Sequence, residues 1–512
     1  MDFSVLWAQW SELWTYQPQN PILFSSGSFL VLFVLFWGVY LLIYNQVSAR
    51  IWYLTAFSLF FYYKSSGEFL ALFAATIVFN YAAGLWLERI EKWKGKLLAG
   101  LIVVNLLPLF YYKYANFWVD NFNALGGNWL RVENLILPVG ISFFTFQTIS
   151  YLVDIYRREV KACTNLLDFG FYLSFFPQLV AGPIVRASDF IAQIRRPIRF
   201  ETHGETVEDK SAINYISNEE LGAALFLIVK GFIKKAIIAN YVAQYADLIY
   251  GTKIGEAAVL NYSGFENLMA MYAYTLQIYC DFSGYSDMAI GLSMLLGFKL
   301  LANFNSPYQS LSITEFWRRW HISLSFWLRD YIYIALGGNR KGEIWRNIFL
   351  MTTMLVGGFW HGASWKFVFW GAMHGLGLIG HKWWANQFKE ATWRKSGWWR
   401  VVAWFLTFHL VAFLWIFFRA LSFEDAFNSI YQIWVSMDLA FFAPFVSARP
   451  LLVCLLGMGF YTHFVANEDK KRLQSFLHSL PFGGKLIILL MIIQISMQLQ
   501  TADVQPFIYF QF

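Results

Sequence analysis

Long apolar runs without a charged residue recur along the whole chain and are separated by short polar stretches. Most of them approach the roughly 20 residues that a helix needs to cross about 30 Å of hydrocarbon. They lack the strict alternation of a membrane strand, so they predict helices. With the less regular windows between 221 and 298, the pattern predicts an all-α polytopic membrane protein of about eleven to thirteen membrane segments, some of them re-entrant. The charge-free runs are Leu13–Ala49, Phe69–Leu87, Leu97–Tyr112, Asn134–Val153, Phe169–Val185, Asn347–Trp365, Val401–Phe418, Pro450–Asn467 and Leu486–Ala502.

The composition agrees with a membrane protein, because 58% of the 512 residues are hydrophobic, 21% are aromatic and only 14% are charged. Lys and Arg concentrate on cytoplasmic loops, so they also orient the chain. An outside amino terminus places more of them inside, and the net charge of +7 is therefore a topology signal rather than an indication of nucleic-acid binding. The first three inner loops then hold Arg50, Arg89, Lys92, Lys94, Lys96, Arg157, Arg158 and Lys161, and the outer loops hold Lys64, Lys113 and Arg131.

Two segments depart from this pattern. Residues 1–21 are predicted to form an interfacial helix, because Trp7, Trp10 and Trp14 recur on one helical face; an ordinary aromatic anchor is the alternative. Residues 200–220 hold six Glu and Asp against Lys210 alone, which predicts a flexible acidic inner loop. The rest of the chain, 22–512, is predicted to be a single transmembrane domain.

The run Phe169–Val185 is predicted to dip into the membrane and return to the same side. Arg186 follows it directly and belongs on the inside, like the basic loop before it. Pro177, Gly182 and Pro183 supply the helix breaks that a re-entrant segment requires.

Ionisable residues gather between 303 and 375, within otherwise apolar sequence rich in Trp, Phe and Gly. An ionisable group in hydrocarbon costs several kcal/mol unless it is paired or faces a wet cavity, so this motif core is predicted to be the functional site. The ionisable members are Arg318, Arg319, His321, Arg329, Asp330, His361 and His374, and Trp320 and Trp360 stand beside the two central histidines.

Ser312 and Glu315 have the spacing of a capping box and predict the start of a helix that the glycine pair 337–338 would close. On one continuous helix, His321 shares a face with Ser325. His321 is therefore predicted to point with a hydroxyl group into the site. A buried histidine that is hydrogen-bonded to backbone is the alternative interpretation.

Arg318 and Arg329 would lie on a neighbouring stripe of the same helix, eleven positions apart. Guanidinium groups bind phosphates bidentately, so these two arginines could hold a phosphate-bearing donor. Alternatively, they pair with Glu315 and Asp330 or mark the cytoplasmic interface.

His361 is flanked by Gly357, Gly358 and Gly362 within an apolar segment. Glycines let another backbone or a slender substrate approach closely. A neutral imidazole at such a place has one nitrogen for an orienting contact and one that can abstract a proton, as general-base acyl transfer requires. His374 is interpreted either as a support for this site or as a structural residue.

These residues do not predict a metal site. His361 and His374 are thirteen positions apart, and neither has a further ligand three or four positions away. Asp281 and Asp287 could suggest a carboxylate pair, but six positions apart they fall on different faces of a helix, which Gly284 is predicted to break. Helix capping or the lining of a tunnel is the favoured interpretation of both aspartates.

Six segments together resemble membrane-bound O-acyltransferases of the bacterial alginate-acetylation branch, and the resemblance covers roughly residues 22–430. It implies that the catalytic histidine of that family is His361 and that its second polar position is His321. It also implies about eleven transmembrane helices plus re-entrant helices around a central tunnel, in the bacterial inner membrane. The segments are 137–143 (LPVGISF), 176–183 (FPQLVAGP), 281–291 (DFSGYSDMAIG), 312–325 (SITEFWRRWHISLS), 336–342 (LGGNRKG) and 360–363 (WHGA).

The resemblance implies acyl transfer from a cytosolic thioester, acetyl-CoA, to a hydroxyl group of an exported polysaccharide or of a periplasmic acetyltransferase partner. His361 would then act as general base, His321 would orient the hydroxyl or polarise the thioester carbonyl, and Arg318 or Arg329 would hold the donor's phosphates. Ser364 stands where that branch is expected to have Asn.

Two alternatives remain at this point. A relative of the teichoic-acid branch would transfer D-alanine from a carrier protein. A lipid or polysaccharide transporter would use its histidines to relay protons, although the sequence has no internal repeat of the kind that marks secondary transporters.

Overall fold

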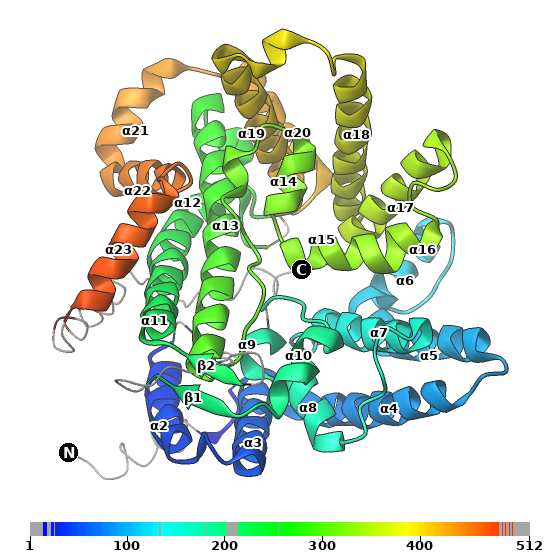
Figure 1. Cartoon of the computed structure of the whole chain (residues 1–512). Coiled ribbons are helices and arrows are strands. Elements are labelled where there is room, and N and C mark those ends of the chain that lie inside the picture. Colours follow the sequence, from blue (N-terminus) through cyan, green and yellow to red (C-terminus); the bar gives the residue numbers. More distant parts are fainter. Residues whose placement is uncertain are drawn as a thin grey trace. The chain divides into compact units, whose positions relative to one another are not determined.

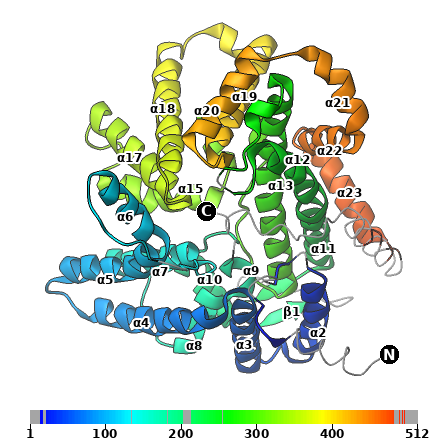
Figure 2. The same cartoon turned by 180° about the vertical axis from the view of Figure 1, so that it is seen from behind.

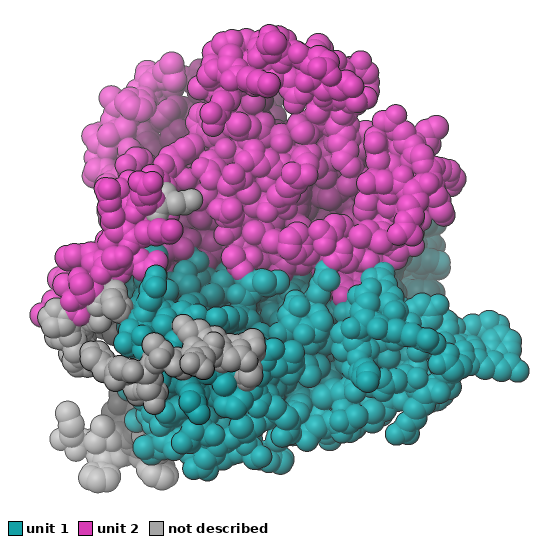
Figure 3. All heavy atoms as spheres, in the orientation of Figure 1, with its two compact units in different colours: residues 1–229, 285–301 teal, residues 230–284, 302–512 magenta. Residues whose placement is uncertain are grey.

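The computed structural model describes residues 14–17, 22–24, 26–132, 135–180, 182–201, 213–253 and 255–480, together with 484, 487, 491 and 494. Most of the described chain is helical and it has only two short strands (Figures 1 and 2), which confirms the all-α prediction. It forms two compact units, residues 1–229 with 285–301 and residues 230–284 with 302–512 (Figure 3). The predicted interfacial helix at 1–21, apart from a few residues, and the apolar run 486–502, apart from three single residues, lie outside the described residues.

The first unit is built from short and medium-length helices and one pair of strands. The chain passes between the two units within α11 (Asn218–Phe232) and within α13 (Gly264–Leu295). The elements are α2 (Gly27–Ile43), α3 (Val47–Ser66), η1 (Gly67–Phe69), α4 (Leu70–Arg89), α5 (Lys94–Leu109), the π-helical η2 (Phe110–Tyr114), α6 (Ala115–Ala124), α7 (Ile141–Arg157), α8 (Leu166–Ser174), α9 (Phe176–Leu179), α10 (Ala187–Ile194), β1 (Ile198–Phe200), β2 (Asn214–Ile216) and α11 (Asn218–Phe232).

Three of these helices, α4, α5 and α7, pack against one another (Figure 1) and share a buried polar contact. The amides of Asn80 and Asn105 donate to each other over 2.8 and 3.0 Å, and Thr148 Oγ1 donates to Asn105 Oδ1 over 3.0 Å. A polar side chain in an apolar interior is costly unless it is hydrogen-bonded, so this trio aligns the three helices.

The predicted breaks in the run 169–185 are present. α8 ends at Ser174, α9 follows from Phe176 to Leu179, and residues 182–186 are not helical. Phe176 is fully buried, and its ring lies 5.1–6.3 Å from those of Phe24, Phe29, Phe33, Phe36, Phe57 and Phe61. The short helix α9 is therefore anchored by an aromatic cluster. Whether the segment enters and leaves on one side of a membrane stays a prediction.

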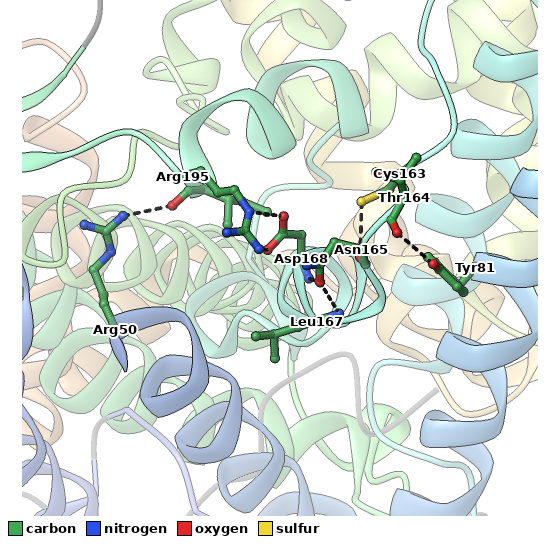
Figure 4. A network of polar contacts seen from close by, with 9 residues as sticks. Arg50, Tyr81, Cys163, Thr164, Asn165, Leu167, Asp168 and Arg195 are labelled. Carbon is green, nitrogen blue, oxygen red and sulfur yellow. Dashed lines mark hydrogen bonds and ion pairs between the residues drawn. The ribbon is translucent and has the colours of Figure 1, made fainter. Parts of the chain in front are cut away.

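A polar network next to α8 fixes the loops around it (Figure 4). The Arg195 guanidinium pairs with Asp168 at 2.6 and 3.0 Å, and Asn165 caps α8 by accepting from the amide of Leu167. Fully buried Arg50 donates to the carbonyl oxygens of Ile194 and Arg196 at 2.9 Å. Backbone carbonyls thus receive the hydrogen bonds of a buried guanidinium, as the cost of burying polar groups requires.

The ends of the acidic insert are regular structure, so the prediction of a flexible loop over all of 200–220 is wrong. Ile198–Phe200 pairs in parallel with Asn214–Ile216, and α11 begins at Asn218; residues 202–212 lie outside the described part. The acidic side chains cap backbone here, because Glu220 and Ser217 form reciprocal bonds of 3.0 and 3.2 Å and Glu201 accepts from the Asn218 amide. Charge composition alone does not distinguish a capping carboxylate from a solvated one.

The second unit contains the motif core. Its elements are the π-helical η3 (Ile233–Ala239), α12 (Asn240–Tyr250), η4 (Val259–Asn261), α13 (Gly264–Leu295), η5 (Pro307–Gln309), α14 (Ile313–Arg319), α15 (Ile322–Leu328), the π-helical η6 (Arg329–Tyr333), α16 (Ile334–Leu336), α17 (Glu343–His361), α18 (Trp365–Gln387), η7 (Thr392–Lys395), α19 (Gly397–Arg419), α20 (Phe423–Val435), η8 (Leu439–Phe441), α21 (Phe442–Ala448), α22 (Pro450–Tyr461) and α23 (Asn467–Ser479).

Three helical stretches of the described chain are long and apolar enough to cross a membrane, namely Val47–Arg89, Lys94–Ala124 and Gly397–Arg419. The pair Phe423–Val435 and Leu439–Ala448, bent by 95°, could count as a fourth, broken span. Gly27–Ile43 and Pro450–Tyr461 are apolar but shorter. The larger number of spans expected from the sequence stays a prediction.

The start of α7 depends on glycine at position 140. Gly140 has φ +73°, and a Cβ atom there would lie 2.6 Å from Leu179 O of α9, so two of the sequence motifs meet at this point. We expect Gly140→Ala to lower the free energy of unfolding by more than about 2 kcal/mol, from backbone strain plus the clash. Thermal unfolding of the protein in detergent measures this.

Gly126→Ala is the matched control, because Gly126 has φ +95° but has no atom within 4 Å of its Cβ position. This variant should lose only about 1 kcal/mol, from strain alone. Equal losses in both variants would contradict the close contact between Gly140 and α9.

Candidate active site

The site is organised by the pair α17 and α18, which pack closely along each other (Figure 1). A Cβ atom on Gly358 would overlap the carbonyl oxygen of Phe367 and lie 3.0 Å from Gly371 Cα. The two backbones therefore touch, as the glycines around His361 predicted. Ser364, the departure from the expected Asn, accepts from the Lys366 amide and caps α18. Asn and Ser are equally good at this position, so the substitution preserves the cap.

His361 is the last residue of α17 and is only 3% exposed. Aromatic rings surround it on several sides. Ring centroids lie 4.9 Å away for Trp360, 5.1 Å for Phe418 and 5.2 Å for Trp370, all edge to face. The imidazole is thus buried among aromatic rings of α17, α18 and α19.

The helix predicted from Ser312 to the glycine pair 337–338 is interrupted. Ser312 caps α14 by accepting from the Glu315 amide, and Gly337 and Gly338 have positive φ at the far end, so both predicted ends are correct. Between them, the helix stops at Arg319 and resumes at Ile322. His321 itself has φ +41° in the left-handed region. The predicted face that joins His321 to Ser325 therefore does not exist, and Ser325 Oγ donates to Trp320 O at 3.3 Å instead.

Asn303 satisfies the polar groups that the break exposes. Its side-chain oxygen accepts from the amide of Ser323 at 3.2 Å and from the Ser323 hydroxyl at 3.0 Å, and it lies 3.2 Å from His321 Nδ1. Its carbonyl oxygen accepts from the Ile322 amide, and the Asn305 amide donates to Arg319 O, both at 2.9 Å. Since Asn303 Oδ1 acts as an acceptor, the proton of a neutral His321 lies on Nδ1.

Asn303 was not singled out by sequence reasoning, although it opens the motif core. The available signal was a polar residue in a short connection directly before the cap at Ser312. Its importance arises from contacts with residues about twenty positions later, which no helical spacing reveals.

Imidazole and indole rings alternate through the site. His321 is fully buried against Phe282 at 4.6 Å, and its ring lies 6.1 Å from Trp360, which in turn lies 4.9 Å from His361. Trp370 continues the row, 5.2 Å from His361 and 4.5 Å from His374. The structure therefore brings together the two histidines that the sequence singled out, with the Trp360 ring beside both.

His374 belongs to the far end of this row. It is fully buried, and Trp317 Nε1 donates to its Nδ1 at 3.3 Å. Its contact with His361 runs through Trp370, which stacks on Trp415. His374 therefore packs in the aromatic wall behind His361. Its role as a support for the reaction stays a prediction. Trp320, 1% exposed, completes that wall with its ring 5.0 Å from Trp415.

The two candidate donor-binding arginines differ. Arg329 lies in the π-helical η6 and forms a bidentate ion pair with Asp330 at 2.6 and 3.0 Å, so the ion-pair alternative is correct for it. Glu315 is bound by Arg319 at 2.8 Å rather than by Arg318. Arg318 is exposed and makes no ion pair with any residue that the structure describes. The break at His321 also removes the common stripe predicted for Arg318 and Arg329.

Asp281 and Asp287 lie within one uninterrupted helix, α13, so the prediction that Gly284 breaks it is wrong. A Cβ atom on Gly284 would lie 2.7 Å from Gly231 O, which shows that this glycine serves close packing. Asp281 is 3% exposed and forms a buried ion pair with Lys235 of η3. Their position inside the helix excludes a role of either aspartate in capping α13 itself. Among the described residues, no three His, Cys, Asp or Glu side chains group as metal ligands.

Comparison with known proteins gives consistent matches. The model of the membrane-bound O-acyltransferase family matches residues 134–422. A probable alginate O-acetylase from Azotobacter vinelandii is 42% identical over 419 residues, which cover 79% of this chain and 76% of the relative. A peptidoglycan O-acetyltransferase from Helicobacter pylori is 35% identical over 439 residues, covering 79% and 78%. A teichoic acid D-alanyltransferase from Bacillus subtilis is 28% identical over 339 residues, covering 65% and 80%.

Substitutions in the buried pair of Lys235 and Asp281 distinguish a structural role of Asp281 from a catalytic one. We expect Asp281→Asn to destabilise the protein by about 3–5 kcal/mol, because it leaves the Lys235 charge buried without compensation. The double variant Lys235→Met with Asp281→Leu should recover most of that loss. Thermal unfolding in detergent checks both. An Asp281→Asn variant of normal stability would contradict the structural assignment.

Proposed function

Because this chain belongs to the membrane-bound O-acyltransferase family, we propose that it moves an acetyl group from a cytosolic thioester, acetyl-CoA, to a hydroxyl group of an exported polysaccharide. Relatives named for alginate and peptidoglycan O-acetylation support a polysaccharide acceptor. The observation that carries the mechanism is the pair of buried histidines, His321 and His361, beside the Trp360 ring. The alternative of a transporter that relays protons is not favoured, because the family of this chain is one of acyltransferases.

In the proposed reaction, His361 is the general base. It takes the proton of the acceptor hydroxyl as the oxygen attacks the thioester carbonyl carbon. The tetrahedral intermediate then collapses, the carbon–sulfur bond breaks, and the protonated imidazole returns the proton to the departing thiolate. The aromatic enclosure formed by Trp360, Trp370 and Phe418 excludes water, which would otherwise compete with the acceptor for the acyl group.

The role that we propose for His321 is based on its contact with Asn303 Oδ1. With the proton on Nδ1 directed to Asn303 Oδ1, the Nε2 atom of His321 carries a lone pair. A lone pair accepts a hydrogen bond from a hydroxyl group but cannot donate one to a carbonyl oxygen. The geometry therefore favours His321 as the residue that orients the acceptor hydroxyl over polarisation of the thioester carbonyl.

The similarity to the membrane-bound O-acyltransferase family also supports a proposal for the architecture around the site. About eleven transmembrane helices and re-entrant elements would enclose a passage for donor and acceptor in the bacterial inner membrane. Donor and acceptor would then reach His361 from opposite leaflets. A periplasmic acetyltransferase is the proposed partner that receives or delivers the acetyl group on the outer side.

Replacement of His361 tests the central role. We expect His361→Ala to lower polysaccharide acetylation by at least about 100-fold, because general-base catalysis contributes at least this factor. Mass spectrometry of the surface polysaccharide at equal membrane abundance of the protein measures it. His409→Ala is the control, since His409 donates or accepts in a separate contact with Tyr272 at 2.8 Å. Full acetylation by His361→Ala would overturn the assignment.

The Asn303 contact gives a separate prediction. Asn303→Leu should impair acetylation and stability together, because it leaves Ser323 and His321 without their common acceptor. Asn303→Asp keeps that acceptor and should retain the fold. It should also retain part of the activity at pH 7, which an acetylation assay on membranes checks. Equal activity of both variants would contradict an orienting role of Asn303.

The donor is tested with labelled thioesters. Purified protein should take acetyl from acetyl-CoA and ignore D-alanyl carrier protein. The reverse preference would favour the branch of the teichoic acid D-alanyltransferases.

A further inference from the structure

Two buried ring nitrogens of α18 have no hydrogen-bond partner among the residues that the structure describes. They are Trp370 Nε1 and His374 Nε2, and both side chains are fully buried. The large majority of buried polar groups in folded proteins are hydrogen-bonded, so each exception calls for an explanation such as a catalytic role. These two nitrogens are therefore candidates for binding a substrate.

The contact between His374 and Trp317 shows which nitrogen of the imidazole carries the proton. Trp317 Nε1 of α14 lies 3.3 Å from His374 Nδ1, and an indole nitrogen can only donate a hydrogen bond. His374 Nδ1 is therefore the acceptor in this contact, and the single proton of the neutral ring is on Nε2. It follows that Trp370 Nε1 and His374 Nε2 are both hydrogen-bond donors.

The two donors lie on one face of α18 and are held in place. Trp370 and His374 are four positions apart, so their side chains lie one above the other, and their ring centroids are 4.5 Å apart. Trp370 stacks on Trp415 at 5.4 Å, and Trp317 lies 5.8 Å from it. Donors that are fixed before the substrate binds stabilise a developing negative charge most strongly, because they need no reorganisation.

The distance from His361 to these donors suits the carbonyl oxygen of the proposed reaction. A general base lies within about 3 Å of the hydroxyl oxygen, that oxygen lies about 3–3.5 Å from the carbonyl carbon, and the carbonyl bond adds about 1.2 Å. The carbonyl oxygen is thus expected roughly 5–7 Å from the basic nitrogen. The Trp370 ring lies 5.2 Å from that of His361, and His374 is the next ring of the row.

The proposed reaction needs donors at this oxygen. As the hydroxyl oxygen attacks, the carbonyl oxygen becomes negatively charged, and N–H groups directed at it lower the barrier. His321 does not suit this task, since its Nε2 atom carries a lone pair when Nδ1 donates to Asn303. His361 holds the proton of the hydroxyl group at that moment.

We propose that Trp370 Nε1 and His374 Nε2 bind the carbonyl oxygen of the acyl thioester and stabilise the oxyanion of the tetrahedral intermediate. Both donors keep their protons throughout. The bond between the hydroxyl oxygen and the carbonyl carbon forms while an electron pair moves onto the carbonyl oxygen. The pair returns as the carbon–sulfur bond breaks. This inference rests on the proposed acetyl transfer and adds two catalytic residues to it.

Two substitutions of His374 distinguish this role from a structural one. His374→Asn can place an oxygen near the position of Nδ1 and so keep the acceptor for Trp317, whereas His374→Gln can place an amide N–H near the position of Nε2. We expect His374→Asn to lower the kcat of acetylation about 100-fold, as the loss of an oxyanion donor does, with little change in KM. His374→Gln should retain most of the kcat. A merely structural role predicts the reverse order and would overturn the assignment.

Trp370→Phe removes the other donor and keeps an aromatic ring. It should also lower kcat about 100-fold. Trp404→Phe is the matched control and should keep the kcat of the parent, because Trp404 Nε1 already donates to Tyr308 O at 2.9 Å. These rates are measured with full-length protein in native membranes, at equal protein abundance, and thermal unfolding in detergent identifies a variant that fails to fold. A normal kcat in Trp370→Phe overturns its part in the proposal.

Infrared spectroscopy of bound acetyl-CoA, labelled with a heavy isotope at the carbonyl carbon, observes the contact directly. A His361→Ala background in full-length protein prevents turnover. Because hydrogen bonds weaken the carbonyl bond, its stretching band should move to higher frequency when Trp370→Phe or His374→Asn is added. An unchanged band in both variants overturns the donor assignment while the proposed function stands. A parent protein that transfers no acetyl group contradicts the proposed function itself.

Discussion

The arrangement around His361 depends on the contact between two helix backbones. Gly358 and Gly371 allow α17 and α18 to touch, so the last turn of α17 brings His361 against Trp370. A side chain at either glycine would separate the helices and move the imidazole out of its aromatic enclosure. Because backbone contact cannot adapt as a flexible side chain can, this constraint holds the position of the imidazole tightly.

Much of this could be predicted from residue types alone. The apolar runs predicted helices, Ser312 marked the correct start of α14, and the glycines around His361 predicted the close approach of a backbone or a substrate, of which the structure shows a backbone. The apolar runs and the helix start are local features, and a close approach of backbones depends on the missing side chain of glycine. Both kinds of feature can be recognised in a sequence. The family and the acyltransferase class also followed from short motifs, and the comparisons confirm them.

The remaining features depend on partners distant in sequence. A helix through His321 was the reasonable expectation, but Asn303 supplies acceptors that make a break there stable. Gly284 was expected to end a helix, yet it lets another backbone approach an intact one. Asp281 was interpreted without Lys235, its partner on another helix. In each case a tertiary contact overrode the local propensity, and such a contact cannot be predicted from the spacing of residues in the sequence.

The ion pair of Lys235 and Asp281 bears on how the second unit assembles. The two residues are 46 positions apart in the chain, and a buried charge without its partner destabilises a fold by about 3–5 kcal/mol. Burying the segment that carries Lys235 is therefore costly until α13 is in place, so η3 and α13 are expected to pack together in one step.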